Sequence, residues 1–346
     1  MSQSGVRTAG ASVRPSRPGM TVALFALKIA ASLGLLWLAT RGIDFGTAFA
    51  TVDQVDPLLL LGAPLAAMVA TGINAIRWRW LMAAHGAPLS LRRSLALLWV
   101  TQFFNSGLPS TLGGDAARIV YAVRAGATGA IVIAATVLDR FAGYCSVILY
   151  AAAAVLLQPF GLAFPPVWRV VVVVLALVVP VGIIVLAVIN ALPRPDAWAR
   201  LATDPDARGP RARTARVLLP FLRVRVDLPS VLTAIIVSVP IVIMVGVALF
   251  LLNTATCGCD DLDLPRAIAV AGPLVLAVSV PISMAGWGVR EVVMIALFEL
   301  MGLPPEQGLV TSVLFGLTMF VAGLPGLFIW LALRAPRSRA GDPASG

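Results

Sequence analysis

The sequence has few charged residues for its length. Only 12% of its 346 residues are Asp, Glu, Lys or Arg, whereas 59% are hydrophobic and the mean hydropathy is +0.95. Soluble domains carry about 25% charged residues, so this composition excludes an ordinary soluble protein. It predicts an all-α, polytopic helical membrane protein, because helices satisfy their backbone polar groups internally and can cross lipid.

Histidine and cysteine are scarce as well, with one His and three Cys in the whole chain. This argues against the common metal, redox and Ser-His-Asp sites, so we expect no cofactor, no metal and no catalytic residue of those classes. Cys257 and Cys259 lie beside several Asp in a short loop; an ordinary polar loop is favoured over a metal or redox role. An intramembrane lipid transferase stays open, with Asp115 or Asp139 as the base for a lipid hydroxyl.

Acidic residues are fewer than basic ones. The 16 Asp and Glu are outnumbered by 26 Lys and Arg, which gives a net charge of +10. Lys28 is the only lysine, and most of the arginines lie between apolar runs. This is the positive-inside pattern of cytoplasmic loops. The excess charge therefore indicates membrane topology and anionic headgroups, with no nucleic acid as a partner.

Six apolar stretches are long enough to cross a membrane, for which about 20 residues are needed. They are residues 20–40, 57–76, 126–158, 167–192, 228–252 and 308–333. We expect a single membrane domain over 20–333, with a disordered cytoplasmic tail at 1–19 and a second cytoplasmic tail at 334–346. The basic loop at 193–227, with eight Arg and four Asp, is also expected in the cytoplasm.

Two further segments are interrupted by helix breakers and charges at membrane depth. Both match Pro-x4-Gly-x3-Arg, and the copies are 172 residues apart. Because they occupy corresponding places in the halves 57–158 and 228–333, we expect two re-entrant hairpins and an inverted internal repeat. Two complete spans in place of either hairpin are the alternative. The matched residues are Pro109, Gly114 and Arg118 in the first copy and Pro281, Gly286 and Arg290 in the second.

The first interrupted segment has the chemistry of an anion site. After Gly113 and Gly114 we expect a helix to start, with its unpaired N–H groups and positive dipole end at membrane depth. Ser110 can cap this helix, and Arg118, one turn in, can form two hydrogen bonds to a phosphate. Asp115 is placed to hold Arg118 through an i,i+3 contact when the site is empty. A headgroup phosphate is the anion most available in a membrane.

The second segment repeats this chemistry and is expected to face the first across the pseudo-axis. In it, glycine backbone is followed by an arginine beside an acid. Met284 and Ala285 stand where a more glycine-rich turn is expected, which predicts a less open second site. The candidate residues are Ser283, Gly286, Gly288, Arg290 and Glu291.

Asp139 and Arg140 are the remaining charges inside a span, and a buried charge needs a partner. They could be a neutralising pair, a proton- or ion-coupling element, or partners of the hairpins, and a structural role is favoured over a functional one. Asn105 belongs to the same candidate site, although such residues more often join helices by hydrogen bonds. We expect His85 to be solvated and the Arg77–Trp80 stretch to anchor the chain at the membrane interface.

A Gly-Gly-Asp-x-x-Arg core, with matching residues on either side, marks this chain. These residues are Asn105, Pro109, Ser110, Gly113, Gly114, Asp115, Arg118, Asp139, Arg140, Gly286, Gly288, Arg290 and Glu291. Together they resemble the transmembrane region of lysylphosphatidylglycerol synthases, a flippase-like family, over residues 20–333. In two-part members this region precedes a cytoplasmic aminoacyl-transferase domain; we do not expect that domain here, because the chain stops at Gly346. The resemblance implies a bacterial inner (plasma) membrane protein that handles a lipid or lipid-linked sugar, without lysyl transfer.

We therefore expect a flippase-like protein that translocates a phosphate-bearing lipid or lipid-linked intermediate between leaflets, with Arg118 and Arg290 as clamps on the headgroup. The partner would be an anionic phospholipid or a polyprenyl-phosphate-linked lipid, and an enzyme of lipid or glycan synthesis could associate with the chain. An intramembrane lipid or glycolipid transferase is the first alternative. A non-transporting accessory subunit that binds a lipid is the second, and an organic-anion transporter is the third.

Overall fold

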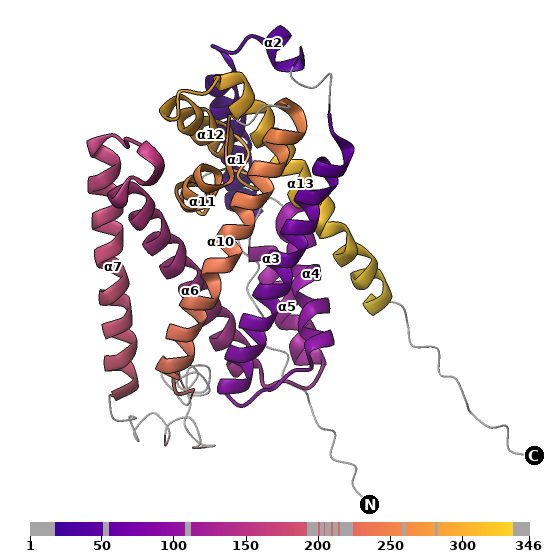
Figure 1. The fold of residues 1–346 in the computed structure, drawn as a ribbon. Helices are drawn as coiled ribbons and strands as arrows, with labels where there is room; N and C mark the ends of the chain where they lie inside the picture. Colours follow the sequence, from indigo (N-terminus) through magenta and orange to yellow (C-terminus); the bar gives the residue numbers. More distant parts are fainter. Residues whose placement is uncertain are drawn as a thin grey trace, which may run out of the picture.

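The structure, a computed structural model, describes residues 18–50, 55–107, 112–191, 224–257, 261–280 and 283–334, with isolated positions between 200 and 214. In these residues every regular element is a helix, which confirms the all-α fold expected from composition. The expectations on Pro109, Ser110, Pro281, Cys259, the two tails and most of the 193–227 loop lie outside them. The helices are α1 (Pro18–Thr40), α2 (Phe45–Ala50), α3 (Pro57–Ala84), α4 (Leu91–Gly107), α5 (Leu112–Arg124), α6 (Gly129–Leu157), the 3₁₀ turn η1 (Pro159–Gly161), α7 (Pro166–Ala191), α10 (Leu228–Cys257), α11 (Leu264–Val278), α12 (Val289–Leu300) and α13 (Pro305–Arg334) (Figure 1).

Five helices of the described chain are long and apolar enough to cross a membrane, namely α3, α6, α7, α10 and α13. The expected first span corresponds to α1, in which Ala26–Thr40 is a shorter apolar stretch. The long helices lie where hydropathy places them. However, α3 continues eight residues beyond the expected end at Ile76. The Arg77–Trp80 stretch therefore lies inside the helix, and part of it turns toward the core.

The two interrupted segments each form a pair of short helices. The α4–α5 pair has 17 and 13 residues, and the α11–α12 pair has 15 and 12. All four are shorter than the roughly 20 residues that a crossing needs, which favours re-entrant hairpins. Each pair lies between two long helices, so the order long, short, short, long occurs twice. Figure 1 shows the short pairs at opposite ends of the bundle, as an inverted repeat requires.

The first long helix of each half starts directly after an aspartate. Asp56 Oδ1 accepts hydrogen bonds from the backbone N–H groups of Leu58 and Leu59 at 2.8 and 3.3 Å at the start of α3. Asp227 accepts from the Ser230 N–H at 3.1 Å at the start of α10. Such caps satisfy N–H groups that have no partner inside the helix. The repeat is thus visible in helix starts as well as in helix order.

Two clusters of buried apolar side chains form the core, one around each short pair. The first joins α4 and α5 to α3, α6 and α10, with Trp78 and Leu138 at its centre. The second joins α11 and α12 to the same three long helices, with Leu249 and Phe298 fully buried. α3, α6 and α10 contribute several residues to both clusters, and α7 contributes Val172 to one and Val179 to the other. The first three helices are therefore the main frame that positions the short pairs relative to each other.

Helices approach closely where a glycine takes the place of a larger residue. At Gly326 in α13, a Cβ would overlap the backbone carbonyl of Trp99 in α4. At Gly272 in α11, it would lie 3.1 Å from the backbone nitrogen of Ala151 in α6. Lipid provides no hydrophobic drive between helices, so small residues that permit close van der Waals contact stabilise a membrane bundle.

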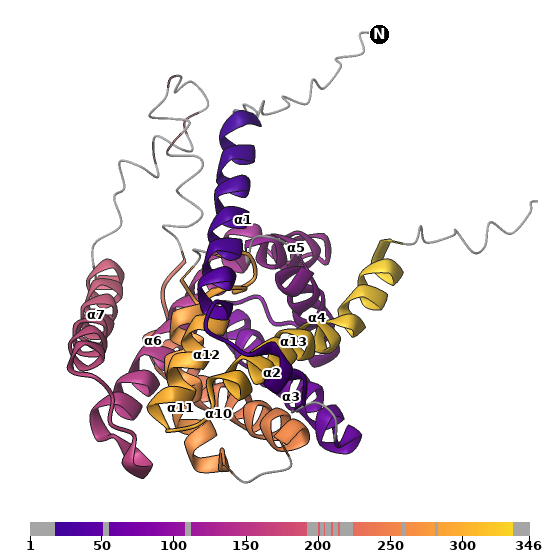
Figure 2. The same ribbon diagram turned by 90° about the horizontal axis from the view of Figure 1, so that it is seen from above.

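Two long helices stand outside the repeated halves. α7 packs mainly against α6, and only Val172 and Val179 of its 26 residues are buried. α1 packs against α12, where the backbone N–H of Met284 donates to Ser32 Oγ at 2.8 Å. Figure 2 shows both helices at the margin of the bundle. α7 therefore presents an apolar surface suited to lipid, whereas α1 lies next to the second short pair.

Candidate functional site

A cavity of about 360 Å³ lies between the two short helix pairs. The first half contributes Asn105 and Ser106 from the end of α4. The second half contributes Ser283 and Gly286 from the turn between α11 and α12, and Arg290 from the first turn of α12. The two interrupted segments thus meet at one cavity rather than forming two separate sites.

Three cations line this cavity, and among its described lining residues there is no carboxylate. Lys28 comes from α1, Arg140 from α6 and Arg290 from α12. Two buried oxygens of the lining side chains, Asn105 Oδ1 and Ser283 Oγ, have no hydrogen-bond partner in the described part of the chain. Of these two atoms only the Ser283 hydroxyl can donate to an anion, because an amide oxygen is an acceptor. A concave site with convergent cations and an unsatisfied hydroxyl has the properties of a binding site for an anion.

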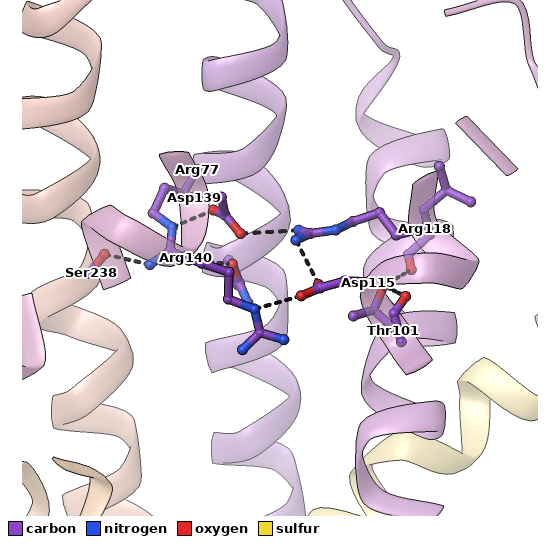
Figure 3. A network of polar contacts seen from close by, with 10 residues as sticks. Arg77, Thr101, Asp115, Arg118, Asp139, Arg140 and Ser238 are labelled. Atoms are coloured by element: carbon purple, nitrogen blue, oxygen red, sulfur yellow. Dashed lines mark hydrogen bonds and ion pairs between the residues drawn. The ribbon is translucent and has the colours of Figure 1, made fainter. Parts of the chain in front are cut away.

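Behind Arg140 lies a chain of buried ion pairs that crosses three helices (Figure 3). Asp139 on α6 accepts from Arg77 Nε of α3 at 2.8 Å and from Arg118 Nη1 of α5 at 3.1 Å. Asp115, in the first turn of α5, accepts from Arg118 Nη2 at 2.8 Å and from Arg140 Nε at 2.7 Å. Cations and carboxylates alternate, so each carboxylate has two cations, which offsets the cost of burying it.

Arg118 is held within this chain rather than at the cavity wall. Its guanidinium carbon lies 5.0 Å from the ring centroid of Trp78, and the residue is only 1% exposed. At the far end of the chain, Arg77 also donates to Ser238 of α10 and to Asn74 Oδ1. The structure thus places Arg140 at the cavity and Arg118 behind it as a positioning residue.

The contacts also decide between the alternatives for the charges in α6. The i,i+3 contact expected between Asp115 and Arg118 is confirmed. Asp139 and Arg140 both take partners on the first short pair, Arg118 and Asp115 respectively. The contacts therefore favour one of the three interpretations, in which Asp139 and Arg140 are partners of the first hairpin.

For the end of α3, the expectation for His85 is wrong, and so is the first half of the expectation for the Arg77–Trp80 stretch, of which Arg79 and Trp80 are exposed. Arg77 and Trp78 do not anchor the chain at the interface, since Arg77 is 7% exposed and Trp78 is fully buried. His85 is not solvated: its Nδ1 lies 2.7 Å from the Leu81 carbonyl oxygen, and its Nε2 accepts from the Asp227 N–H at 3.4 Å. The physical reason is that α3 continues as a helix to Ala84, which carries these side chains into the bundle.

The expected helix start after Gly113 and Gly114 is also wrong, because α5 begins at Leu112 and includes both glycines in its first turn. Gly114 serves close packing instead. A Cβ there would overlap the Thr101 carbonyl oxygen and the Asn105 side chain of α4. Thr101 Oγ1 donates to the Gly114 carbonyl at 3.3 Å. The glycine brings α5 against α4 and so sets the position of the ion-pair chain.

The second segment has the arrangement that we expected of the first. Gly286 and Gly288 have φ values of +83° and +89°, which glycine adopts without strain, and α12 starts directly after them. The Gly288 N–H donates to Glu291 Oε2 at 2.6 Å, and Glu291 Oε1 accepts from Arg290 Nη2 at 2.7 Å. Ser312 of α13 accepts from Arg290 Nε at 3.2 Å. A single carboxylate thus caps the helix and orients the arginine.

Arg290 occupies space that Gly316 leaves open, since a Cβ at Gly316 would overlap the Arg290 guanidinium. The guanidinium carbon lies 4.4 Å from the ring centroid of Trp287. Ala285 has a φ of +49°, so the turn forms with alanine where a further glycine was expected. Ala285, Trp287 and Arg290 all line the cavity, and the expectation of a less open second segment stays a prediction.

Sequence reasoning did not assign two charged residues to this site. Lys28 lines the cavity from α1, and its signal is an ionisable residue inside an expected span. Arg77 belongs to the ion-pair chain, and its signal is the spacing Arg77, Trp78, Leu81 and Met82, which share one face of a helix. Both signals become informative once the helix bounds are known.

Comparison with known protein families shows to which family the chain belongs. The family model described as lysylphosphatidylglycerol synthase TM region matches residues 25–326. This chain belongs to that family. The match includes both short pairs, the ion-pair chain and all the residues that line the cavity. The chain is therefore a multi-pass membrane protein of a family related to lipid modification or flipping. A comparison with curated proteins found no match.

Proposed function

We propose that this protein translocates a phosphate-bearing lipid or lipid-linked intermediate between the leaflets of a bacterial inner membrane, with both termini in the cytoplasm. The observation that carries the proposal is the cavity between the two short pairs, with its three lining cations. Cations among apolar spans are costly and mark substrate pathways. A headgroup phosphate is the anion that a membrane supplies at that position.

The repeated architecture supports exchange between leaflets. Transporters with inverted repeats bind substrate at the repeat interface and expose it to each side in turn. Here Arg140 comes from the first half and Arg290 from the second, so a phosphate between them would contact both halves. Arg140 is also the last member of the ion-pair chain, through Asp115. Headgroup binding would in this way act on the position of the first short pair.

The test is lipid exchange in reconstituted vesicles with a fluorescent phospholipid and an impermeant quencher. The variant is the double replacement Arg290→Gln with Glu291→Gln, which removes the cation together with its carboxylate and leaves no unpaired buried charge. We expect the protein-dependent exchange rate to fall at least about tenfold, the effect of losing one charged hydrogen bond of ordinary strength.

The matched control is Arg266→Gln, which also removes an arginine from the second half. Arg266 is partly exposed at the start of α11 and lies 3.8 Å from Asp263, away from the cavity, so exchange should stay near the wild-type rate. Unchanged exchange in the double variant would contradict the proposal. Formation of a labelled product would instead indicate a transferase, and lipid retention without any exchange would indicate an accessory subunit.

A further inference from the structure

The charges around the cavity do not balance. The cavity wall and the two ion-pair groups that reach it contain five cations and three carboxylates, a formal net charge of +2. The residues that join the short helices, 108–111 and 281–282, add no charged side chain. The cations are Lys28, Arg77, Arg118, Arg140 and Arg290, and the carboxylates are Asp115, Asp139 and Glu291.

Lys28 differs from the other two cations of the wall. Arg140 bonds to Asp115, and Arg290 bonds to Glu291, so each already has a carboxylate. Lys28 makes no ion pair with any residue that the structure describes. It also comes from α1, which belongs to neither repeated half. Lys28 is thus the cation of the cavity wall without a carboxylate partner among the described residues, and it comes from a helix outside the repeat.

An uncompensated charge inside a membrane protein is costly, so the occupant of the cavity has to bring the missing negative charge. A phosphodiester carries one negative charge, whereas a phosphomonoester carries about −1.5 to −2 at neutral pH. A diphosphate linkage likewise carries two. Only a group with about two negative charges brings the site close to neutrality.

We propose that the cavity selects a lipid whose headgroup contains a dianionic phosphate group, either a phosphomonoester or a diphosphate, and that Lys28 sets this preference. The inference rests on the proposed function and names the substrate class for the same site. The unpartnered Ser283 hydroxyl adds a donor for the additional phosphate oxygens, and Ser283 is only 6% exposed. An aminoacylated or zwitterionic headgroup would place its amine beside three cations, with no carboxylate among the described lining residues, so the cavity disfavours both.

Equilibrium lipid binding tests this inference separately from translocation. The full chain in detergent is offered an equimolar mixture of phosphatidic acid, phosphatidylglycerol and phosphatidylethanolamine with identical acyl chains, and retained lipid is measured by native mass spectrometry. We expect about tenfold more phosphatidic acid than phosphatidylglycerol on the wild-type protein, corresponding to one additional charged contact. Phosphatidylethanolamine should be retained least.

The Lys28→Gln variant should bring the ratio of phosphatidic acid to phosphatidylglycerol close to one, because it removes one of the two excess charges. Lys28→Arg should keep the wild-type ratio. The matched control is Arg41→Gln, which removes a cation just after the same helix, outside the cavity, and should also keep it. A melting temperature equal to that of the wild type shows that each variant is folded.

Three outcomes would overturn the inference. The first is equal retention of phosphatidic acid and phosphatidylglycerol by the wild type, and the second is a ratio that Lys28→Gln leaves unchanged. Inorganic phosphate is added as a competitor to separate a lipid from a free anion; phosphate binding without lipid retention would also overturn it. A clear preference for phosphatidic acid without leaflet exchange would leave this inference intact and refute translocation. Leaflet exchange without that preference would leave translocation intact and refute this inference.

Discussion

At the scale of single residues, the most consequential feature is the alternating chain from Arg77 to Arg140. Two carboxylates and three arginines from α3, α5 and α6 share hydrogen bonds of 2.7 to 3.1 Å. A buried ion pair is weak evidence for stability, but removing one partner is costly because the other charge is left behind. The chain therefore fixes how three helices are arranged, and it holds Arg140 beside the cavity.

Replacement of Arg77 tests how much the ion-pair chain contributes to the stability of the protein. Arg77→Gln leaves Asp139 with Arg118 as its one remaining cation, and we expect a loss of about 3 kcal/mol, seen as a lower melting temperature in detergent. Arg79→Gln is the control two positions along, because Arg79 is exposed, lies outside the ion-pair chain, and its Nε donates to the Leu89 carbonyl at 2.9 Å. It should cost about 1 kcal/mol. Equal losses of stability in the two variants would contradict a special role for the ion-pair chain.

At the scale of elements, the short helices depend on glycine contacts with their neighbours. Gly114 brings α5 against α4, and Gly326 brings α13 against α4, so α4 packs closely on two sides. The end of α4 carries Asn105 and Ser106 into the cavity. Close packing of this helix is thus what positions the contribution of the first half to the site.

Two glycine replacements test this packing, because one is expected to lower the stability of the protein and the other to raise it. Gly326→Ala places a methyl group against the Trp99 carbonyl and should destabilise the protein by about 1 to 3 kcal/mol. Gly72→Ala in α3 meets nothing within 4 Å and should stabilise it by about 0.5 to 1 kcal/mol, because alanine is the better helix former. Thermal unfolding in detergent measures both. A gain of stability at Gly326 would show that the α4–α13 contact is looser than described.

At the scale of the whole molecule, the helix order predicts which loops share a side of the membrane. The start of α3, the α6–α7 turn and the start of α13 should lie on one side. The α3–α4 and α5–α6 turns should lie on the other, together with the basic loop at 193–227. By the positive-inside rule, that second side is the cytoplasm.

Labelling of single cysteines tests this topology in intact cells. Native cysteines are replaced by serine, and Thr47→Cys in the short helix α2 is made together with Ala163→Cys, Ser90→Cys and Ala125→Cys in three loops, all at exposed positions. An impermeant maleimide should label positions 47 and 163 in intact cells. It should label positions 90 and 125 only after the cells are lysed. Labelling of position 90 or 125 in intact cells would reverse or break the proposed order.

The long helices and the two interruptions could be predicted from sequence because hydropathy and helix breakers are local signals. The partners of the charges could not, since they depend on which faces meet. Arg77 resembled an interface anchor, and only its position inside α3 shows that it binds Asp139. Arg118 and Arg290 occupied matching motif positions, yet Arg118 lies within the ion-pair chain and Arg290 lines the cavity. The expected set of binding residues around both arginines stays a prediction.

The sparsely packed α7 has a consequence for how the chain inserts. Each repeated half contains two long crossings and one short pair, and a short pair adds an even number of crossings whether it turns back or passes through. A half therefore ends on the side where it began. Two halves of opposite orientation can be joined only by an odd number of crossings, and among the helices that the structure describes α7 is the one that joins them. The main role of α7 is therefore to reverse the orientation of the second half. Its exposed apolar residues are free to change as long as they stay apolar, whereas deletion of α7 would insert the second half upside down.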